Sequence, residues 1–261
     1  MKRRFEIKNR RGQKIVGVVE VVENAKGVVI VMHGSGGFQE QPHLELISDL
    51  YQAEGYAVVR FDGTSSLGES EGEMIDFRVT TYLHDLEDLV DWVKKQEWFM
   101  GGLHFAGHSI GGLCANIYAQ NHPRAVASVV SLSSTLSGAI YRKQTSHNLD
   151  AWKACGYRES TSKSKPGHIK RYAWELIEDL DKYDVLEGAS KMTMPVLVVV
   201  GDEDRGVSPE DQERFCERIA GPSVFYKFKK TDHNYQNEGS LEQLFKVLHD
   251  WVSCLPKGID K

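Results

Sequence analysis

A serine between glycines stands at residues 107–111 (GHSIG), after a short apolar run and before a helix-like segment. The apolar run at 103–106 is typical of a buried strand, and 112–122 is typical of a helix. A strand-to-helix turn at this point is so tight that only small residues fit beside the serine, which would leave the Ser109 hydroxyl exposed. The pentapeptide alone is a weak signal in a chain with 24 glycines. It gains weight if a loop rich in free N–H groups precedes it, and if an acid and then a histidine follow later strands.

Short apolar runs alternate with amphipathic segments along the rest of the chain. We expect strands at 5–8, 14–22, 28–32, 57–61, 103–106, 127–132, 195–200 and 223–228, and helices at 42–54, 80–96, 112–122, 209–219 and 241–252. Turn residues at 9–12 predict that the first two strands form an antiparallel pair at a sheet edge. The short connections elsewhere predict an α/β fold, with a mostly parallel central sheet of about eight strands flanked by helices.

The pattern changes between residues 136 and 192, where aromatic, Lys and Arg residues replace the buried strand runs and 160–167 is loop-like. We expect a small lid insertion here, after the sixth strand, on a core formed by 1–135 and 193–261. Its aromatic side chains form either a small core of their own or part of a pocket wall, for which Trp152, Trp174 and Tyr141 are the candidates. Its Lys and Arg residues leave open a solvated surface or a preference for acidic substrates.

Residues suited to nucleophilic catalysis follow the ends of the expected strands. A serine hydroxyl needs a base to take its proton, and His233 lies in the loop after the last strand. The imidazole in turn needs a carboxylate, and Asp204 follows the preceding strand. Asp202 is the alternative acid, but Asp204 lies deeper in the loop and has room to reach back towards the histidine. The order is therefore serine, acid, histidine.

The negative oxygen formed during acyl transfer needs rigid N–H donors. The loop at 33–37 (HGSGG) ends a buried strand and exposes backbone N–H groups at the carboxyl edge of the sheet. We expect the oxyanion hole to use the N–H groups of Ser35 and Ile110, while His33 orders its loop.

Composition narrows the range of partners and cofactors. The 32 Lys and Arg residues and 37 Asp and Glu residues give a net charge of −5, which provides no general attraction for nucleic acid or an anionic membrane. A small-molecule ester is the expected partner. The histidines and the four cysteines lack metal-ligand spacing, so we expect no metal and no cofactor. The N-terminal segment has no apolar signal region, which favours a cytoplasmic protein. The oligomeric state stays open, with a homodimer as one option.

These features together resemble the α/β-hydrolase superfamily. Within it, 60–63 (RFDG), 68–72 (GESEG) and the compact insertion resemble bacterial cinnamoyl and feruloyl esterases and serine aminopeptidase-like hydrolases. That subgroup commonly carries His-Gly-Phe at the oxyanion loop and Ser-Gln-Gly at the serine turn, where this chain has Ser35 and Ile110. The resemblance implies the α/β-hydrolase fold, catalysis by Ser109, Asp204 and His233, and no cofactor.

The sequence thus predicts a carboxylesterase-like serine hydrolase, which cleaves esters of small or aromatic acyl groups through an acyl-enzyme on Ser109. Two alternatives stay open. The first is an amide hydrolase of the aminopeptidase or acyl-peptidase type with the same residues. The second is a protein of the same fold that binds a ligand without catalysis, because fold and motif do not by themselves prove turnover.

Overall fold

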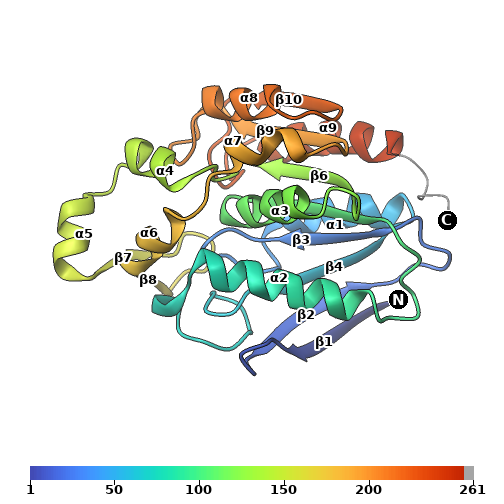
Figure 1. The fold of residues 1–261 in the computed structure, drawn as a ribbon, viewed down its shortest axis with the longest axis horizontal. Helices are drawn as coiled ribbons and strands as arrows, with labels where there is room; N and C mark the ends of the chain where they lie inside the picture. The colour runs from blue at the N-terminus through green and yellow to red at the C-terminus, as the bar shows by residue number, and fades with distance from the viewer. Residues whose placement is uncertain (256–261) are drawn as a thin grey trace.

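The computed structural model describes residues 1–255, in which eight strands form one central sheet (Figure 1). The strand order is β1-β2-β4-β3-β5-β6-β9-β10. The strands are β1 (Lys2–Lys8), β2 (Lys14–Glu20), β3 (Val28–Met32), β4 (Ala57–Asp62), β5 (Leu103–His108), β6 (Val126–Leu132), β9 (Val196–Gly201) and β10 (Ser223–Phe228). The β1–β2 and β2–β4 pairs are antiparallel, and neighbours from β4 to β10 are parallel. The predicted α/β-hydrolase fold, with its antiparallel edge pair, is confirmed.

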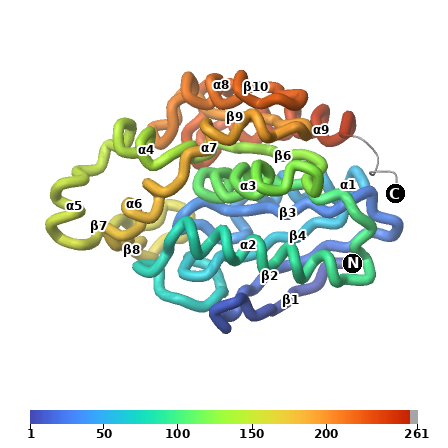
Figure 2. The backbone as a smooth tube through the Cα atoms, viewed as in Figure 1, coloured from blue at the N-terminus to red at the C-terminus, as the bar shows by residue number. Residues whose placement is uncertain are grey.

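Helices cover both faces of this sheet (Figures 1 and 2). One face packs against α1 (Pro42–Ala53) and α9 (Ser240–Cys254), and the other against α2 (Val79–Val93), α3 (Ile110–Asn121) and α8 (Pro209–Glu217). A short 3₁₀ turn, η1 (Met74–Asp76), precedes α2. The apolar residues of α2 recur at helical spacing and lie on its buried side, which is why this amphipathic segment packs on the sheet.

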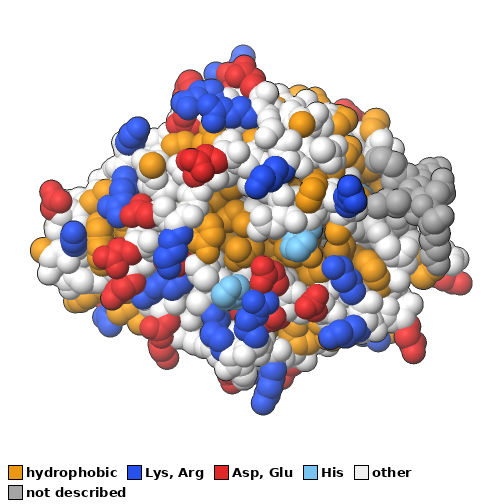
Figure 3. Space-filling model, viewed as in Figure 1, with side chains coloured by type: hydrophobic (Ala, Val, Ile, Leu, Met, Phe, Trp, Pro, Cys, Tyr) orange, Lys and Arg blue, Asp and Glu red, His pale blue; other side chains and the backbone are white. Residues whose placement is uncertain are grey.

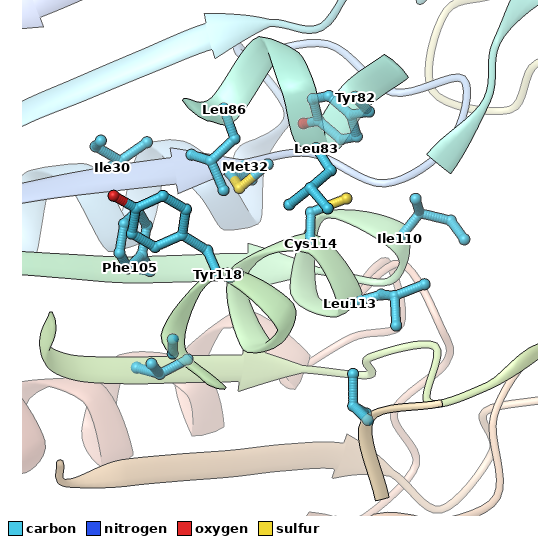
Figure 4. Packing of buried hydrophobic residues seen from close by; sticks show 14 of the residues in the cluster. Ile30, Met32, Tyr82, Leu83, Leu86, Phe105, Ile110, Leu113, Cys114 and Tyr118 are labelled. Atoms are coloured by element: carbon cyan, nitrogen blue, oxygen red, sulfur yellow. The ribbon is translucent and has the colours of Figure 1, made fainter. Parts of the chain in front are cut away.

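The central strands are buried on both faces and contribute to two separate cores. In β3, Ile30 and Met32 point to the core beneath α2 and α3, whereas Val29 and Val31 point to the core beneath α1 and α9. Figure 4 shows the first of these cores, where side chains of α2 and α3 meet those of β3 and β5. Strands covered on both faces explain the uninterrupted apolar runs in the sequence.

Most residues between β6 and β9 lie outside the central sheet, beyond the end towards which β6 runs (Figures 1 and 2), whereas residues 185–191 pack against α3. This insertion contains α4 (Gly138–Gln144), α5 (Leu149–Cys155), β7 (Tyr157–Thr161), β8 (Ile169–Ala173), α6 (Glu175–Leu180), α7 (Val185–Gly188) and the 3₁₀ turn η2 (Ala189–Lys191). The expected loop at 160–167 is wrong at its start, because Ser160 and Thr161 belong to β7 and pair with Lys170 and Ile169 in an antiparallel hairpin. The hairpin has no apolar run, so the sequence pattern did not reveal it.

The visible surface carries charges of both signs. Figure 3 shows Lys and Arg side chains interspersed with Asp and Glu across this face, without a large region of one sign. Among the helices within residues 1–255, none combines the length and the apolar character needed to cross a lipid bilayer.

One buried histidine makes the stability of this fold depend on pH. His104 of β5 is 2% exposed, lies edge-on to the ring of Tyr56, and its Nδ1 is 2.8 Å from the hydroxyl of Ser128. Burial lowers the pKa of His104 to about 4, because the charged ring would lose its hydration. The neutral ring therefore contributes stability above the unfolded-state pKa of about 6.5, and this contribution is lost as the pH falls towards 4.

We predict that the wild-type free energy of unfolding falls between about pH 7 and pH 5 by some 1–2 kcal/mol more than that of His104→Gln, which cannot titrate. Urea unfolding at both pH values measures this difference. The matched control is His168→Gln, since His168 is exposed, and it should keep the wild-type pH dependence. Equal pH dependence in the wild type and His104→Gln would contradict the prediction.

Candidate active site

Ser109 occupies the turn between β5 and α3 in a strained backbone conformation. Its φ of 55° and ψ of −119° are rarely adopted by a residue with a side chain, and strain of this kind persists only where the surrounding structure enforces it. A Cβ atom on Gly107 would overlap the carbonyl oxygen of Gly111, and one on Gly111 would overlap the carbonyl oxygen of His33. The glycines on either side of the serine are therefore required by the close approach of the backbone.

Two further side chains from separate loops line up with the Ser109 hydroxyl. His233, after β10, places Nε2 3.1 Å from Ser109 Oγ. Its Nδ1 lies 2.8 Å and 2.9 Å from the two carboxylate oxygens of Asp204, which follows β9. Because a carboxylate only accepts hydrogen bonds, Nδ1 carries the proton and donates it, and Nε2 is free to accept from the serine. The structure brings together the three residues that the sequence singled out.

The environment of Asp204 keeps its carboxylate charged. Burial by itself would raise the pKa of Asp204, but the hydrogen bond from His233 and the N–H of Gly206 at 2.7 Å hold it below its ordinary value. The N–H of Val207 also donates to it, at 3.1 Å. Asp202, the alternative acid, is exposed, and its backbone N–H bonds to the carbonyl oxygen of Phe228. Only Asp204 contacts the histidine.

His108 fixes the position of the loop that carries His233. Its Nε2–H donates to the carbonyl oxygen of His233 at 2.7 Å. Burial lowers the pKa of His108 well below its ordinary value, so the ring is neutral. His108 is thus a positioning residue within the serine turn, a link that the sequence did not reveal.

The loop that carries Ser35 is tied to the neighbouring strand. The N–H of Gly63 donates to His33 Nε2 at 2.9 Å, which leaves the proton on Nδ1 to bond the carbonyl oxygen of Gly34 at 2.7 Å. The pKa of His33 is lowered by burial, in keeping with a neutral ring that orders its loop. Asp62 accepts the N–H of Gln39 at 2.8 Å. These bonds anchor the loop on both sides of Ser35.

The N–H groups of Ile110 and Ser35 are available for an oxyanion. Ile110 is the first residue of α3, where a helix has no internal acceptor for its N–H. Within residues 1–255 neither N–H donates to a protein acceptor. A Cβ atom on Gly34 would lie 3.0 Å from Ser109 Cβ, so the loop runs directly beside the serine.

A cavity of about 320 Å³ opens over Ser109. Its wall comes from the loop that carries Ser35, the loop that carries His233 and the insertion, with Arg158, Lys170 and Tyr172 among the insertion residues. Among the described residues that line it there is no Asp or Glu. Sequence reasoning missed these three residues as wall residues. The sequences 157–161 (YREST) and 169–173 (IKRYA) do not alternate between apolar and polar residues, so no signal in the chain showed which side chains turn inwards.

The aromatic residues expected in the pocket wall do not line this cavity. Trp152 and Trp174 are 3% and 8% exposed and pack edge-to-face at 6.1 Å in the core of the insertion. Trp152 Nε1 donates to the carbonyl oxygen of Tyr172, and Trp174 Nε1 donates to Glu178. Tyr141 is half-buried and packs against the same core. The expectation for the three residues is corrected accordingly, because the insertion uses its large rings to hold itself together.

A comparison with known protein families shows which family the chain belongs to. The family model for X-Pro dipeptidyl-peptidase (S15 family) matches residues 17–178 of the 261. The chain belongs to the S15 family. The match includes the loop at 33–37, the serine turn and most of the insertion, and the eight-stranded sheet has the α/β-hydrolase fold.

Curated relatives of this S15-family chain are peptidases by name. Proline iminopeptidase of Lactobacillus helveticus (strain DPC 4571) is 28% identical over 129 residues, which cover 48% of this chain and 41% of the relative. Proline iminopeptidase of Lactobacillus delbrueckii subsp. lactis is 27% identical over 126 residues, covering 46% and 40%. The matched region thus spans less than half the length of these relatives.

Solved structures similar to this S15-family chain share its fold over nearly the whole length. Est1E from Butyrivibrio proteoclasticus, determined with ferulic acid bound, has a TM-score of 0.83 and 21% identity, covering 96% of this chain and 98% of that one. Mouse alpha/beta hydrolase domain-containing protein 10 has a TM-score of 0.79 and 17% identity, covering 97% and 100%.

The geometry predicts different effects for the two acids of the β9 loop. Asp204→Asn should lower kcat for hydrolysis of 4-nitrophenyl acetate by about 10³- to 10⁴-fold, because the amide no longer stabilises a charged imidazole and favours the wrong tautomer. Asp202→Asn is the matched control and should stay within about twofold of the wild type, since its side chain does not contact His233. Steady-state kinetics of both variants, with circular dichroism to confirm folding, measures this. A larger loss of kcat in Asp202→Asn than in Asp204→Asn would show that Asp202, and not Asp204, is the acid.

Proposed function

We propose that the protein hydrolyses carboxylic esters through an acyl-enzyme on Ser109. The alignment of Ser109, His233 and Asp204 within hydrogen-bond distance supports this proposal most directly. His233 Nε2 takes the Ser109 proton as Oγ attacks the ester carbonyl, and Asp204 stabilises the imidazolium that forms. The N–H groups of Ser35 and Ile110 hold the negative carbonyl oxygen of the tetrahedral intermediate.

Collapse of this intermediate breaks the ester bond, and His233 returns its proton to the departing alkoxide. A water molecule then attacks the acyl-enzyme, with His233 again taking the proton, and Ser109 is regenerated. The cavity of about 320 Å³ has room for a small or aromatic acyl group. The insertion at 136–192 would act as a lid that covers this cavity.

The cavity wall favours esters over the N-terminal ends of peptides. An aminopeptidase has to bind a free α-ammonium group, and a buried ammonium needs a carboxylate or several acceptors to offset its lost hydration. The described wall contains no Asp or Glu, and Arg158 and Lys170 bring positive charge to it. A substrate ammonium would therefore be repelled.

Cleavage of amides is the second candidate, because the chain belongs to the S15 family and resembles proline iminopeptidases over about half its length. The same residues would carry it out, with His233 protonating an amine rather than an alkoxide. The two candidates differ in the substrate and not in the nucleophile.

Comparison of kcat/KM for 4-nitrophenyl esters and for aminoacyl 4-nitroanilides, proline included, distinguishes the two. We expect the esters to be the better substrates, and Ser109→Ala to lower their turnover by more than about a thousandfold while the unfolding midpoint changes little. Ser134→Ala is a matched control, because Ser134 is a buried serine outside the proposed set. Faster cleavage of an aminoacyl anilide would replace the esterase assignment with the peptidase one. Undiminished ester turnover in Ser109→Ala would contradict the proposed role of Ser109 as the nucleophile.

A further inference from the structure

One face of the β7–β8 hairpin forms a wall of the cavity above Ser109. Arg158 pairs with Tyr172 across the hairpin, and Ser160 pairs with Lys170. Side chains directly opposite one another, and two residues apart along a strand, share a face. All four residues line the cavity, so this face of the hairpin is turned towards the serine.

The two cations on this inner face have no anionic partner within residues 1–255. Neither Arg158 nor Lys170 forms an ion pair or donates a side-chain hydrogen bond there, and the Nε of Arg158 is enclosed without an acceptor. The Arg158 guanidinium carbon lies 5.0 Å from the ring centre of Trp152 and 5.3 Å from that of Tyr172. On the outer face, by contrast, Arg171 is paired with Glu159. The hairpin thus neutralises its outer cation and leaves the inner two uncompensated.

Arg158 and Lys170 both lie close to Ser109. A Cβ atom on Gly36 would lie 2.9 Å from Cδ of Lys170 and 2.5 Å from the hydroxyl of Tyr172, so the hairpin packs on the loop that carries Ser35. That loop runs beside Ser109. Burial lowers the pKa of Lys170, and the nearby Arg158 lowers it further. Two partly desolvated cations side by side are costly, and an anion between them would offset that cost.

We propose that the substrate carries a carboxylate, on its acyl or its alcohol part, which Arg158 and Lys170 bind. This inference rests on the proposed ester hydrolysis and specifies the class of ester. Arg158 supplies guanidinium N–H donors in a plane, a geometry that suits a carboxylate, and its contacts with the rings of Trp152 and Tyr172 restrict its motion. Lys170 adds a second charge from the neighbouring strand.

The test compares pairs of esters in which a carboxylate is replaced by a neutral group. For the acyl part, mono-4-nitrophenyl adipate is compared with 4-nitrophenyl hexanoate; for the alcohol part, 4-acetoxybenzoate is compared with its methyl ester. We expect the carboxylate ester of at least one pair to have a kcat/KM at least about tenfold higher than its neutral partner, mainly through KM. The pair that shows the preference identifies the part of the substrate bound by the cations.

Variants of the hairpin test whether Arg158 and Lys170 cause the preference for carboxylate esters. Arg158→Gln and Lys170→Gln should each lower the charged-to-neutral ratio by about tenfold. The matched control is Arg171→Gln, on the outer face, which should keep the wild-type ratio. If Arg158→Gln does not fold, Arg158→Lys should retain part of the preference, and titration of Ser109→Ala with monomethyl adipate by calorimetry should show binding that weakens with salt.

Two results would overturn the inference while the proposed function stands. In the first, neutral esters are hydrolysed at least as well as the carboxylate esters of both pairs. In the second, the preference exists but is unchanged in Arg158→Gln and Lys170→Gln. If the wild type hydrolyses no ester, charged or neutral, the proposed function fails and the inference fails with it.

Discussion

The strained backbone at Ser109 is the constraint on which the rest of the site depends. Left to itself, a serine would leave this conformation for an ordinary one, at a gain of about 1–3 kcal/mol. Hydrogen bonds to three neighbouring segments prevent this: the N–H of Ser109 donates to the carbonyl oxygen of Leu132 in β6, and its carbonyl oxygen accepts from Leu113 in α3 and from Thr135 in the loop after β6. Because β5 is hydrogen-bonded to both β3 and β6, the strand end of the turn is fixed, and the hydroxyl stays raised from the sheet.

Because the strands are parallel, the loops that carry the other site residues lie at the same edge of the sheet as Ser109. The loops after β3, β9 and β10 carry Ser35, Asp204 and His233, residues far apart in the chain, and all leave the sheet at its carboxyl end. Burial and hydrogen bonds decide their protonation states. Asp204 stays charged because donors surround it, whereas His33 and His108 stay neutral because the protein interior disfavours their charge.

The burial of each element determines how well the sequence predicts it. Strands buried on both faces leave continuous apolar runs such as 28–32, so the central sheet was predictable nearly strand by strand. The positions of Ser109 and Asp204 were predictable because each follows such a run, and that of His233 because it follows the β-prone segment 223–228. The β7–β8 hairpin was not, because its strands are short and half exposed, with polar side chains on the face that meets the cavity. The roles of Trp152 and Trp174 could not be decided either, since a large ring suits a small core as well as a pocket wall.

The central claim is that the structure holds Ser109 ready to react with an acyl group. Incubation of the purified protein with a fluorophosphonate probe, followed by peptide mass spectrometry, tests this most directly, because the probe forms a stable adduct only with an activated nucleophile. We predict a single adduct on Ser109 that is lost in His233→Ala. An adduct on another residue, or labelling of Ser109 that does not depend on His233, would contradict the claim.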